Sequence, residues 1–399
     1  MLFNHDEHTE LLACYRDGLL ENVLPFWLSH AIDKEYGGFL HSLNQNGDVI
    51  DTDKSLWIQC RFTWLLSTLY NKTDRNNDWL SAATNGIEFI EKYGFDEDGR
   101  VFFWVTRDGK PLRKRRYVYA EAFAAMAYSA YAKASGQQYY ADKAKQIYEC
   151  YIHYISTPNL LESKINTNVR PMRSLSEMMM GIVLGQTIRE NLDYPDSTKW
   201  IDHCIDQLDS LFVNDQEQAV MECVSDDGEI LDHFDGRLLN PGHAIETSWF
   251  ILNESRYRNN DADLINLGTR MIDYMWPRGW DNEHGGIVQF CDVYNHPVQE
   301  YWHDMKFWWP QTDSIAALLT AYILTGNDKY KKWHRMTHDW AHEHFQDHEH
   351  GEWFGYLHRD GSISSTLKGN MWKGPFHLPR MQMYCWQMME ELSKEPVTI

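Results

Sequence analysis

The sequence predicts an all-α protein, an (α/α)6 barrel of six helix pairs with short β-hairpins at one end. Apolar residues recur with helical spacing along most of the chain, which indicates a mainly helical protein. A short acidic segment with a glycine turn recurs between several of the predicted helices. No Pro/Ser/Gly-rich linker or low-complexity run divides the chain, so we expect residues 1–399 to form a single domain.

The predicted helices follow one another at short intervals. Taken as six pairs, they would close into a ring with an inner and an outer layer, and loops and helix ends would converge on a concave mouth, where pockets form. The expected helices cover, in order, 8–30, 54–72, 76–93, 117–136, 137–156, 171–191, 196–212, 242–258, 261–276, 304–326, 327–345 and 375–394.

The recurring segment predicts small hairpins between these helices. Copies lie at 33–47, 95–109, 281–290 and 347–361, and each combines acidic residues, a glycine turn and a short β-rich run. Several end in Asn-Gly or Asp-Gly, which is typical of hairpin turns. Repetition at wide intervals, with helix pairs between the copies, favours a repeat architecture.

The composition excludes several classes of partner. Lys and Arg number 37 against 58 Asp and Glu, a net charge of −21, and the only basic run is 113–116, so we expect no nucleic-acid or membrane partner. No apolar run reaches the length of a membrane span, and the first residues are too polar for a secretory signal. Seven scattered cysteines without a CxxC pair indicate a reduced, cytoplasmic protein.

The aromatic content is 14%, with 17 Trp and 22 Tyr. Part of it builds the core. Trp and Tyr also combine a flat apolar face with a polar edge, which suits a pocket that stacks on sugar rings.

Two histidines are the candidate proton-transfer groups. The turn Asn240-Pro-Gly places His243 at the mouth of a predicted helix, with Glu246 three residues on over the same face. An imidazole can take or give a proton near neutral pH, and a nearby carboxylate can fix its tautomer. The alternative is a buried histidine that caps a neighbouring helix. A second histidine, His377 in Lys373–Arg380, would meet His243 at the barrel mouth.

An arginine and several tryptophans are candidate pocket residues. Arg61 lies between Trp57 and Trp64 on one predicted helix face, where it needs either a ligand or a carboxylate partner. Trp309 follows Trp308 and would form a pocket wall. Asp313, a few residues on, could support an imidazole, or the segment could be a buried first turn of a helix.

Other kinds of site find little support. The clusters at 342–344 and 348–350 each contain two histidines, but their spacing fits no metalloprotease or structural-zinc pattern, and we expect them in a solvated interhelical hairpin without a metal. The chain has no GxxxxGK[ST] loop, no GxGxxG after a strand and no GxSxG elbow.

Five blocks over nearly the whole length resemble the N-acylglucosamine 2-epimerase family. That resemblance implies an (α/α)6 barrel, commonly dimeric, that interconverts N-acetylglucosamine and N-acetylmannosamine without a redox or metal cofactor. It implies that His243 and His377 are catalytic, that Arg61 is the active-site arginine, and that ATP could be an activator although no P-loop marks its site. The blocks are 54–61, 236–246, 304–310, 351–356 and 368–380.

Two positions depart from the family pattern. Asp313 stands where relatives have Glu, and Ser174 stands where cellobiose epimerases and mannose isomerases carry a further histidine. The second departure favours the acyl-aminosugar branch over ketose formation.

The predicted mechanism moves the C2 proton of the open-chain sugar between two imidazoles on opposite faces. Arg61 would stabilise the enolate oxygen at C1, and Glu246, with Asp313, would hold the histidine tautomers. Trp57, Trp309 and Trp372 would exclude water and stack on the sugar. The alternatives are an aldose–ketose isomerase, an epimerase of another sugar, a hydrolase working through two carboxylates, and a non-catalytic sugar-binding protein.

Overall fold

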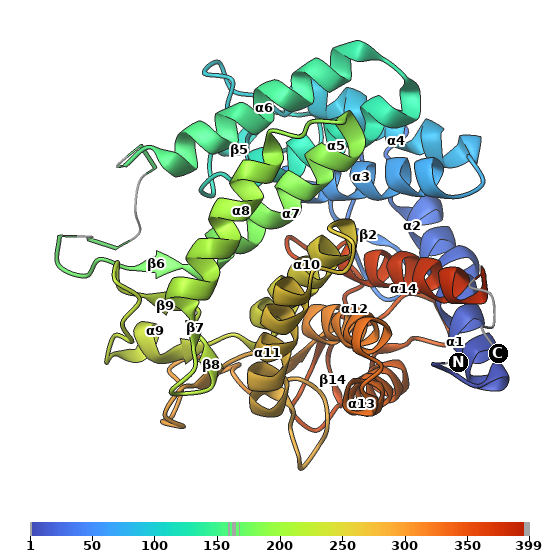
Figure 1. The fold of residues 1–399 in the computed structure, drawn as a ribbon. Coiled ribbons are helices and arrows are strands. Elements are labelled where there is room, and N and C mark those ends of the chain that lie inside the picture. The colour runs from blue at the N-terminus through green and yellow to red at the C-terminus, as the bar shows by residue number, and fades with distance from the viewer. Residues whose placement is uncertain (1, 159, 162–164, 167, 395–399) are drawn as a thin grey trace.

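The computed structural model describes residues 2–158, 160–161, 165–166 and 168–394, and it confirms the predicted all-α class. Its long helices form two layers (Figure 1). The inner layer consists of α3 (Leu56–Lys72), α5 (Tyr119–Ser135), α7 (Leu175–Leu192), α10 (Pro241–Tyr257), α12 (Trp308–Thr325) and α14 (His377–Lys394). The outer layer consists of α1 (His5–Asp17), α2 (Leu24–His30), α4 (Asn77–Tyr93), α6 (Gln138–Ser156), α8 (Ser197–Gln207), α11 (Ala262–Gly279) and α13 (Asp328–Phe345).

The inner helices contact one another in a closed ring. Each of α3, α5, α7, α10 and α12 packs against the next in that order, and α14 then contacts both α12 and α3. The first and last parts of the chain also meet, since α1 lies beside α14, blue and red in Figure 1.

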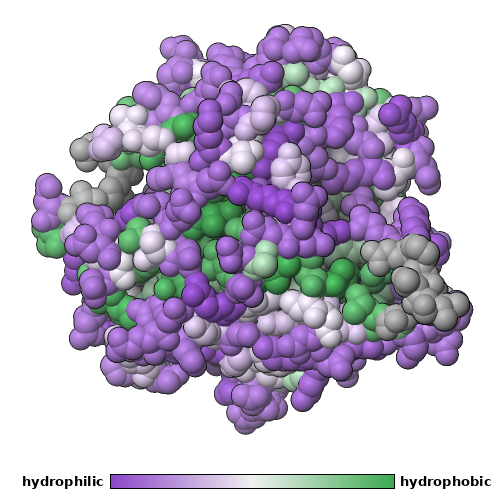
Figure 2. All heavy atoms as spheres, in the orientation of Figure 1, coloured by the Kyte–Doolittle hydropathy of each residue, from purple (hydrophilic) through white to green (hydrophobic). Residues whose placement is uncertain are grey.

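The inner helices are buried on nearly all sides and the outer helices on one side only, and the amino-acid composition of each helix reflects this difference. Every residue of 120–132 in α5 is buried, and seven of them are alanines that let neighbouring helices approach from all sides. The outer helix α4 buries only one stripe, which includes Trp79, Ile87 and Ile90. Figure 2 shows hydrophilic side chains over most of one face of the molecule, with a band of hydrophobic ones across its middle. None of the described helices is both long enough and apolar enough to span a membrane.

Short antiparallel strands connect the layers, and all four predicted hairpin segments contain antiparallel bridges. The structure adds one hairpin that the sequence did not reveal, between β7 and β8. The strands are β1 (Ser42–Leu43), β2 (Val49–Asp51), β3 (Lys54–Ser55), β4 (Trp104–Val105), β5 (Pro111–Arg113), β6 (Arg173–Ser174), β7 (Val213–Asn214), β8 (Ala219–Val220), β9 (Cys223–Val224), β10 (Leu238–Leu239), β11 (Cys291–Asp292), β12 (Lys306–Phe307), β13 (Tyr356–Leu357) and β14 (Ile363–Ser365).

Several helix boundaries differ from the prediction for a common reason. The helices expected from 54, 171 and 304 begin later, because the residues before them pair as β3, β6 and β12. The helix expected over 8–30 is α1 and α2 joined by a π-helical turn, η1 (Gly18–Val23), and the one expected over 196–212 ends in a second such turn, η2 (Leu208–Phe212). A four-residue helix, α9 (Phe234–Arg237), precedes β10. Thus α3, α7, α10 and α12 each follow directly on a paired strand, which holds their N-terminal ends at the mouth.

Buried aspartate–lysine pairs stabilise the hairpins. In one copy, Asp281 accepts hydrogen bonds from Lys306 Nζ at 3.0 Å and Arg359 Nε at 2.8 Å, and the Lys306 side chain is fully buried. Burial would raise the pKa of Asp281, but the hydrogen bonds from Arg359 and Lys306 hold that pKa well below its usual range. Two other copies repeat the pairing, as Asp33 with Lys54 and Asp347 with Lys368.

We predict that Lys306→Met lowers the free energy of unfolding by about 3 kcal/mol, because it leaves a buried carboxylate without its ammonium partner. Since the pKa of Asp281 is depressed in the folded protein, the stabilisation is present above the unfolded pKa of about 4 and is lost as the pH falls further. Chemical denaturation at pH 7 measures the change. The control is Lys199→Met, which removes an 84% exposed lysine and should cost less than about 0.5 kcal/mol. Equal effects would contradict a stabilising role for the buried pair.

Candidate active site

The candidate residues meet at the N-terminal ends of the inner helices. His243 lies in the first turn of α10, His377 is the first residue of α14, and Asp313 lies in the second turn of α12. Arg61 lies in α3, which contacts α14 and α5 in the ring. The structure therefore brings together residues that are more than 300 positions apart in the chain.

His243 is fixed by two polar neighbours. The Asn240 side chain caps the helix by accepting a hydrogen bond from the His243 backbone N–H at 3.2 Å. The His243 Nδ1–H donates to a Glu222 carboxylate oxygen at 2.9 Å, which leaves Nε2 free. Burial alone would lower the pKa of His243, but the charge and hydrogen bond of Glu222 outweigh it and raise that pKa above 6.5.

His377 has the opposite electrostatic environment. Its Nδ1–H donates to Asp313 Oδ2 at 2.9 Å, and the other oxygen of Asp313 accepts from Arg380 Nη2 at 2.7 Å. Burial lowers the pKa of His377 well below 6.5, and the positive charge of Arg380 lowers it further. Burial also raises the pKa of Asp313 to about 6 against the opposing effect of Arg380, so this carboxylate is ionised at neutral pH.

The structure corrects the position expected for Glu246. We expected its carboxylate beside His243, but it accepts a hydrogen bond from Arg380, and Glu222 occupies the place beside His243. The reason is the buried guanidinium of Arg380, which is only 3% exposed and requires carboxylate partners. Glu246 and Asp313 provide them from α10 and α12.

Glu246, Asp313 and His377 offer ligand atoms within 4.8 Å of one another, which raises the question of a metal ion. The Arg380 Nη2 group already contacts all three side chains, at 3.2 Å from His377 Nδ1 and 2.7 Å from Asp313 Oδ1. A fixed guanidinium thus occupies the position of a cation and balances the two carboxylates.

Trp309 lies beside both histidines. Its ring centroid lies 5.1 Å from that of His243 and 5.9 Å from that of His377. The close approach depends on Gly242, because a Cβ there would lie 2.6 Å from the Trp309 ring.

Arg61 is surrounded by aromatic rings. Its guanidinium lies over Phe123 at 4.1 Å and over Phe376 at 4.7 Å, measured to the ring centroids. Burial lowers the pKa of Arg61 to about 9, and the charge of Arg380 contributes. Within the described part of the chain, no carboxylate lies within 4.0 Å of this guanidinium, so the expected alternative of an arginine paired with an acid is not observed.

Trp57 and Trp372 form an aromatic pair beside Arg61. Their ring centroids are 6.0 Å apart, and Trp57 also stacks with the Arg61 guanidinium at 5.4 Å. Trp57 is buried, whereas Trp372 is 38% exposed. This pair therefore reaches from the interior to the solvent.

Three polar residues around the histidines escaped the sequence prediction of the site. Asn240 and Arg380 lie inside the segments singled out around His243 and His377, so proximity in sequence could have suggested them. Glu222 lies between β8 and β9, and no local pattern indicates it. Ser174 lies close by, because β6 and β9 pair with Ser174 opposite Cys223.

The chain is similar to known proteins over most of its length. The family model for N-acylglucosamine 2-epimerase matches residues 37–377. The N-acylglucosamine 2-epimerase of Bos taurus is 32% identical over 97% of this chain and 94% of its own length. The cellobiose 2-epimerase of Eubacterium cellulosolvens is 26% identical over 91% of this chain and 95% of that protein.

A solved structure shows the same fold. The cellobiose 2-epimerase from Spirochaeta thermophila superimposes with a TM-score of 0.84 at 20% identity, covering 98% of this chain and 99% of that one. Together with the match of the family model over most of the sequence, this establishes that the chain belongs to the N-acylglucosamine 2-epimerase family.

Proposed function

We propose that this protein interconverts N-acetylglucosamine and N-acetylmannosamine by moving the proton at C2 of the open-chain sugar. The observation that carries the proposal is that two histidines, both beside the Trp309 ring, have pKa values shifted in opposite directions. His243 has a raised pKa beside Glu222, and His377 has a lowered pKa beside Arg380. His243 thus favours its protonated form and His377 its neutral form, which suits one to act as an acid and the other as a base.

In the proposed reaction, the free Nε2 of His377 takes the C2 proton from one epimer, and the imidazolium of His243 returns a proton to the other face. The Nδ1 hydrogen bonds to Asp313 and Glu222 keep each Nε2 directed toward the substrate. After a turnover the protonation states are exchanged, which allows the reverse reaction.

Arg61 provides the positive charge for the enolate oxygen at C1. Its guanidinium is partly buried among aromatic rings, where an electrostatic interaction is stronger than in water. Trp57 and Trp372 would stack on the sugar and exclude solvent beside it.

The substrate class rests on Ser174 and on the carboxylates. Ser174 Oγ hydrogen-bonds Ser176 Oγ at 2.8 Å, so the position beside Glu222 offers no third imidazole for ketose chemistry. A hydrolase would need two available carboxylates, but Glu246 and Asp313 are both bonded to Arg380. The acyl-aminosugar reaction is therefore favoured.

Family resemblance supports two further proposals, activation by ATP and a homodimer. The uninterrupted sequence supports a single domain over 1–399, and the scattered cysteines support a cytoplasmic location. Neither a redox nor a metal cofactor takes part in the proposed reaction.

Incubation of N-acetylmannosamine with the protein in heavy water tests the proposed function. We expect N-acetylglucosamine carrying deuterium at C2, seen by NMR, with ATP added or omitted to test activation. Faster formation of fructose from mannose would instead indicate an aldose–ketose isomerase, and binding of sugar without exchange would indicate a non-catalytic protein.

Glu222→Gln tests the acid role of His243. The protonated form of His243 is lost as the pH rises through its pKa, so this pKa sets the alkaline limb of kcat/KM. Removing the Glu222 charge should move that limb to lower pH by about one unit. The control Glu229→Gln changes an exposed residue of the following turn and should leave the profile unchanged. An unmoved limb in Glu222→Gln would refute the assignment.

Arg61→Lys should lower kcat by roughly 10²–10³, the scale of losing one oxyanion donor. An ammonium has no planar fork, so it cannot reproduce the geometry of the guanidinium. Steady-state kinetics with N-acetylmannosamine measure the loss. Turnover close to that of the wild type would indicate that Arg61 has a structural role and does not stabilise the enolate.

His243→Asn and His377→Asn should each reduce epimerisation by at least about 10², the scale of a general acid–base. The remaining histidine should still exchange the C2 hydrogen of one epimer with solvent, without inversion, and the two variants should exchange different epimers. NMR in heavy water measures the exchange once circular dichroism shows that both variants are folded. Exchange of the same epimer by both variants would exclude the two-face mechanism.

A further inference from the structure

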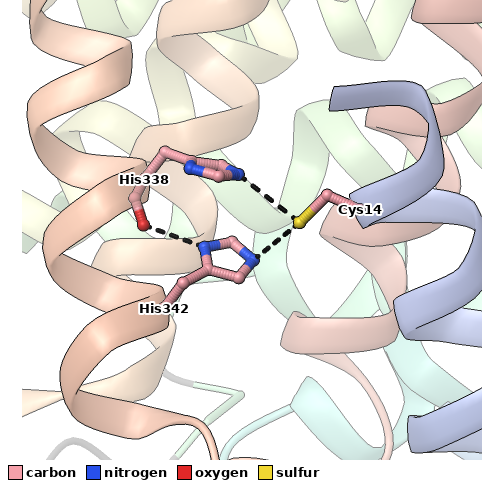
Figure 3. A group of neighbouring side chains, drawn as sticks. All are labelled: Cys14, His338 and His342. Carbon is pink, nitrogen blue, oxygen red and sulfur yellow. Dashed lines mark hydrogen bonds between the residues drawn. The ribbon is translucent and has the colours of Figure 1, made fainter. Parts of the chain in front are cut away.

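We propose that Cys14, His338 and His342 form a site for a thiophilic divalent metal ion such as Zn²⁺, between the outer helices α1 and α13 (Figure 3). The sulfur of Cys14 lies 3.7 Å from His338 Nε2 and 3.4 Å from His342 Nε2. The site uses no residue of the candidate active site, and it goes beyond the proposed epimerase function.

The sequence had suggested a different arrangement for one of these histidines. His342 was expected in a solvated hairpin together with His344, but both lie in the last turns of α13. Because His338 precedes His342 by four residues, their rings share one helix face, with centroids 4.0 Å apart. His344 lies elsewhere, stacked on Trp340 at 4.4 Å.

The second ring nitrogen of each histidine is anchored in the manner of a metal ligand. His342 Nδ1–H donates to the backbone oxygen of His338 at 2.8 Å, and His338 Nδ1–H donates to Asp339 Oδ1 at 3.1 Å. Such outer hydrogen bonds fix the tautomer of ligating histidines and direct Nε2 at the metal. Both Nε2 lone pairs therefore point at the sulfur of Cys14.

The three side chains cannot satisfy one another's hydrogen-bonding atoms. Two nitrogen lone pairs and one sulfur meet, but only the single thiol hydrogen is available to lie between them. A cation would interact favourably with all three atoms. On binding, the thiol proton leaves to solvent, the thiolate and the two neutral imidazoles each donate an electron pair, and no oxidation takes place.

The spacing also fits a tetrahedral ion. With the usual Zn–S and Zn–N lengths, a tetrahedral site separates sulfur from nitrogen by about 3.6 Å. The two observed separations, 3.4 and 3.7 Å, bracket this value. Cys14 and His342 are partly exposed, so water can enter as the fourth ligand. A bound ion would link α1 to α13.

The charges around the site permit a cation. Arg335, one turn before Asp339 on α13, is paired with Glu10 at 3.2 Å and with Asp339 at 3.4 Å. Its positive charge is thus balanced by two carboxylates from the same two helices.

Cobalt titration of the full-length protein, reduced and freed of metal with EDTA, tests the proposal. We expect one equivalent of Co²⁺ to give a thiolate-to-cobalt charge-transfer band and the intense visible bands of a tetrahedral ion, with Zn²⁺ displacing it. Cys14→Ser should lose the charge-transfer band, and His342→Gln should weaken Zn²⁺ binding by about 100-fold or more.

Two matched controls accompany these variants. His344→Gln removes a histidine of the same helix that lies outside the cluster, and Cys150→Ser removes another partly buried thiol, so both should bind Co²⁺ like the wild type. Circular dichroism establishes that each variant is folded. Failure of the wild type to bind one equivalent, or an unchanged cobalt spectrum in Cys14→Ser, would overturn the proposal.

Discussion

The buried guanidinium of Arg380 is the interaction on which the arrangement of the site depends. It comes from α14 and bonds to Glu246 of α10 and Asp313 of α12, so one side chain ties three inner helices together. Removing one partner of such a buried group costs about 3–5 kcal/mol, because the remaining charge is left uncompensated. The same guanidinium touches His377 Nδ1 at 3.2 Å, which means that the link between the helices also sets the electrostatics of the site.

The charges of the pocket balance when the two histidines differ in protonation. The positive charges of Arg61 and Arg380 are matched by Glu246 and Asp313, which leaves His377 neutral. The remaining carboxylate, Glu222, lies beside His243 and raises its pKa, which favours the protonated form that would balance this charge. A neutral total is favoured among these buried groups because an uncompensated charge is costly away from water. The difference in pKa between the two histidines thus follows from which carboxylate already has an arginine.

The sequence predicted the positions of the helices well and the hydrogen-bond partners of the site residues less well. Helical periodicity located the helices to within a few residues, and the errors at 54, 171 and 304 arose because β3, β6 and β12 depend on pairing with distant hairpins. Local spacing brought out His243 and His377, whereas the pairing of His243 with Glu222 joins two elements that only the fold brings together. Glu246 shows the same limit, because His243 pairs with Glu222, which lies between two strands and 21 positions away, and not with the carboxylate three residues on along its own helix.

Asp313 shows how packing decides the length of a side chain. It is completely buried, and its two oxygens reach His377 Nδ1 at 2.9 Å and Arg380 Nη2 at 2.7 Å, both good hydrogen-bond distances. A longer carboxylate in this closed space would have to move either the imidazole or the guanidinium, since neither the ring nor the planar fork can fold away. Because Glu246 already holds the other side of the Arg380 group, the shorter aspartate fits the gap that remains. An aspartate at this position therefore lets the imidazole keep its carboxylate partner.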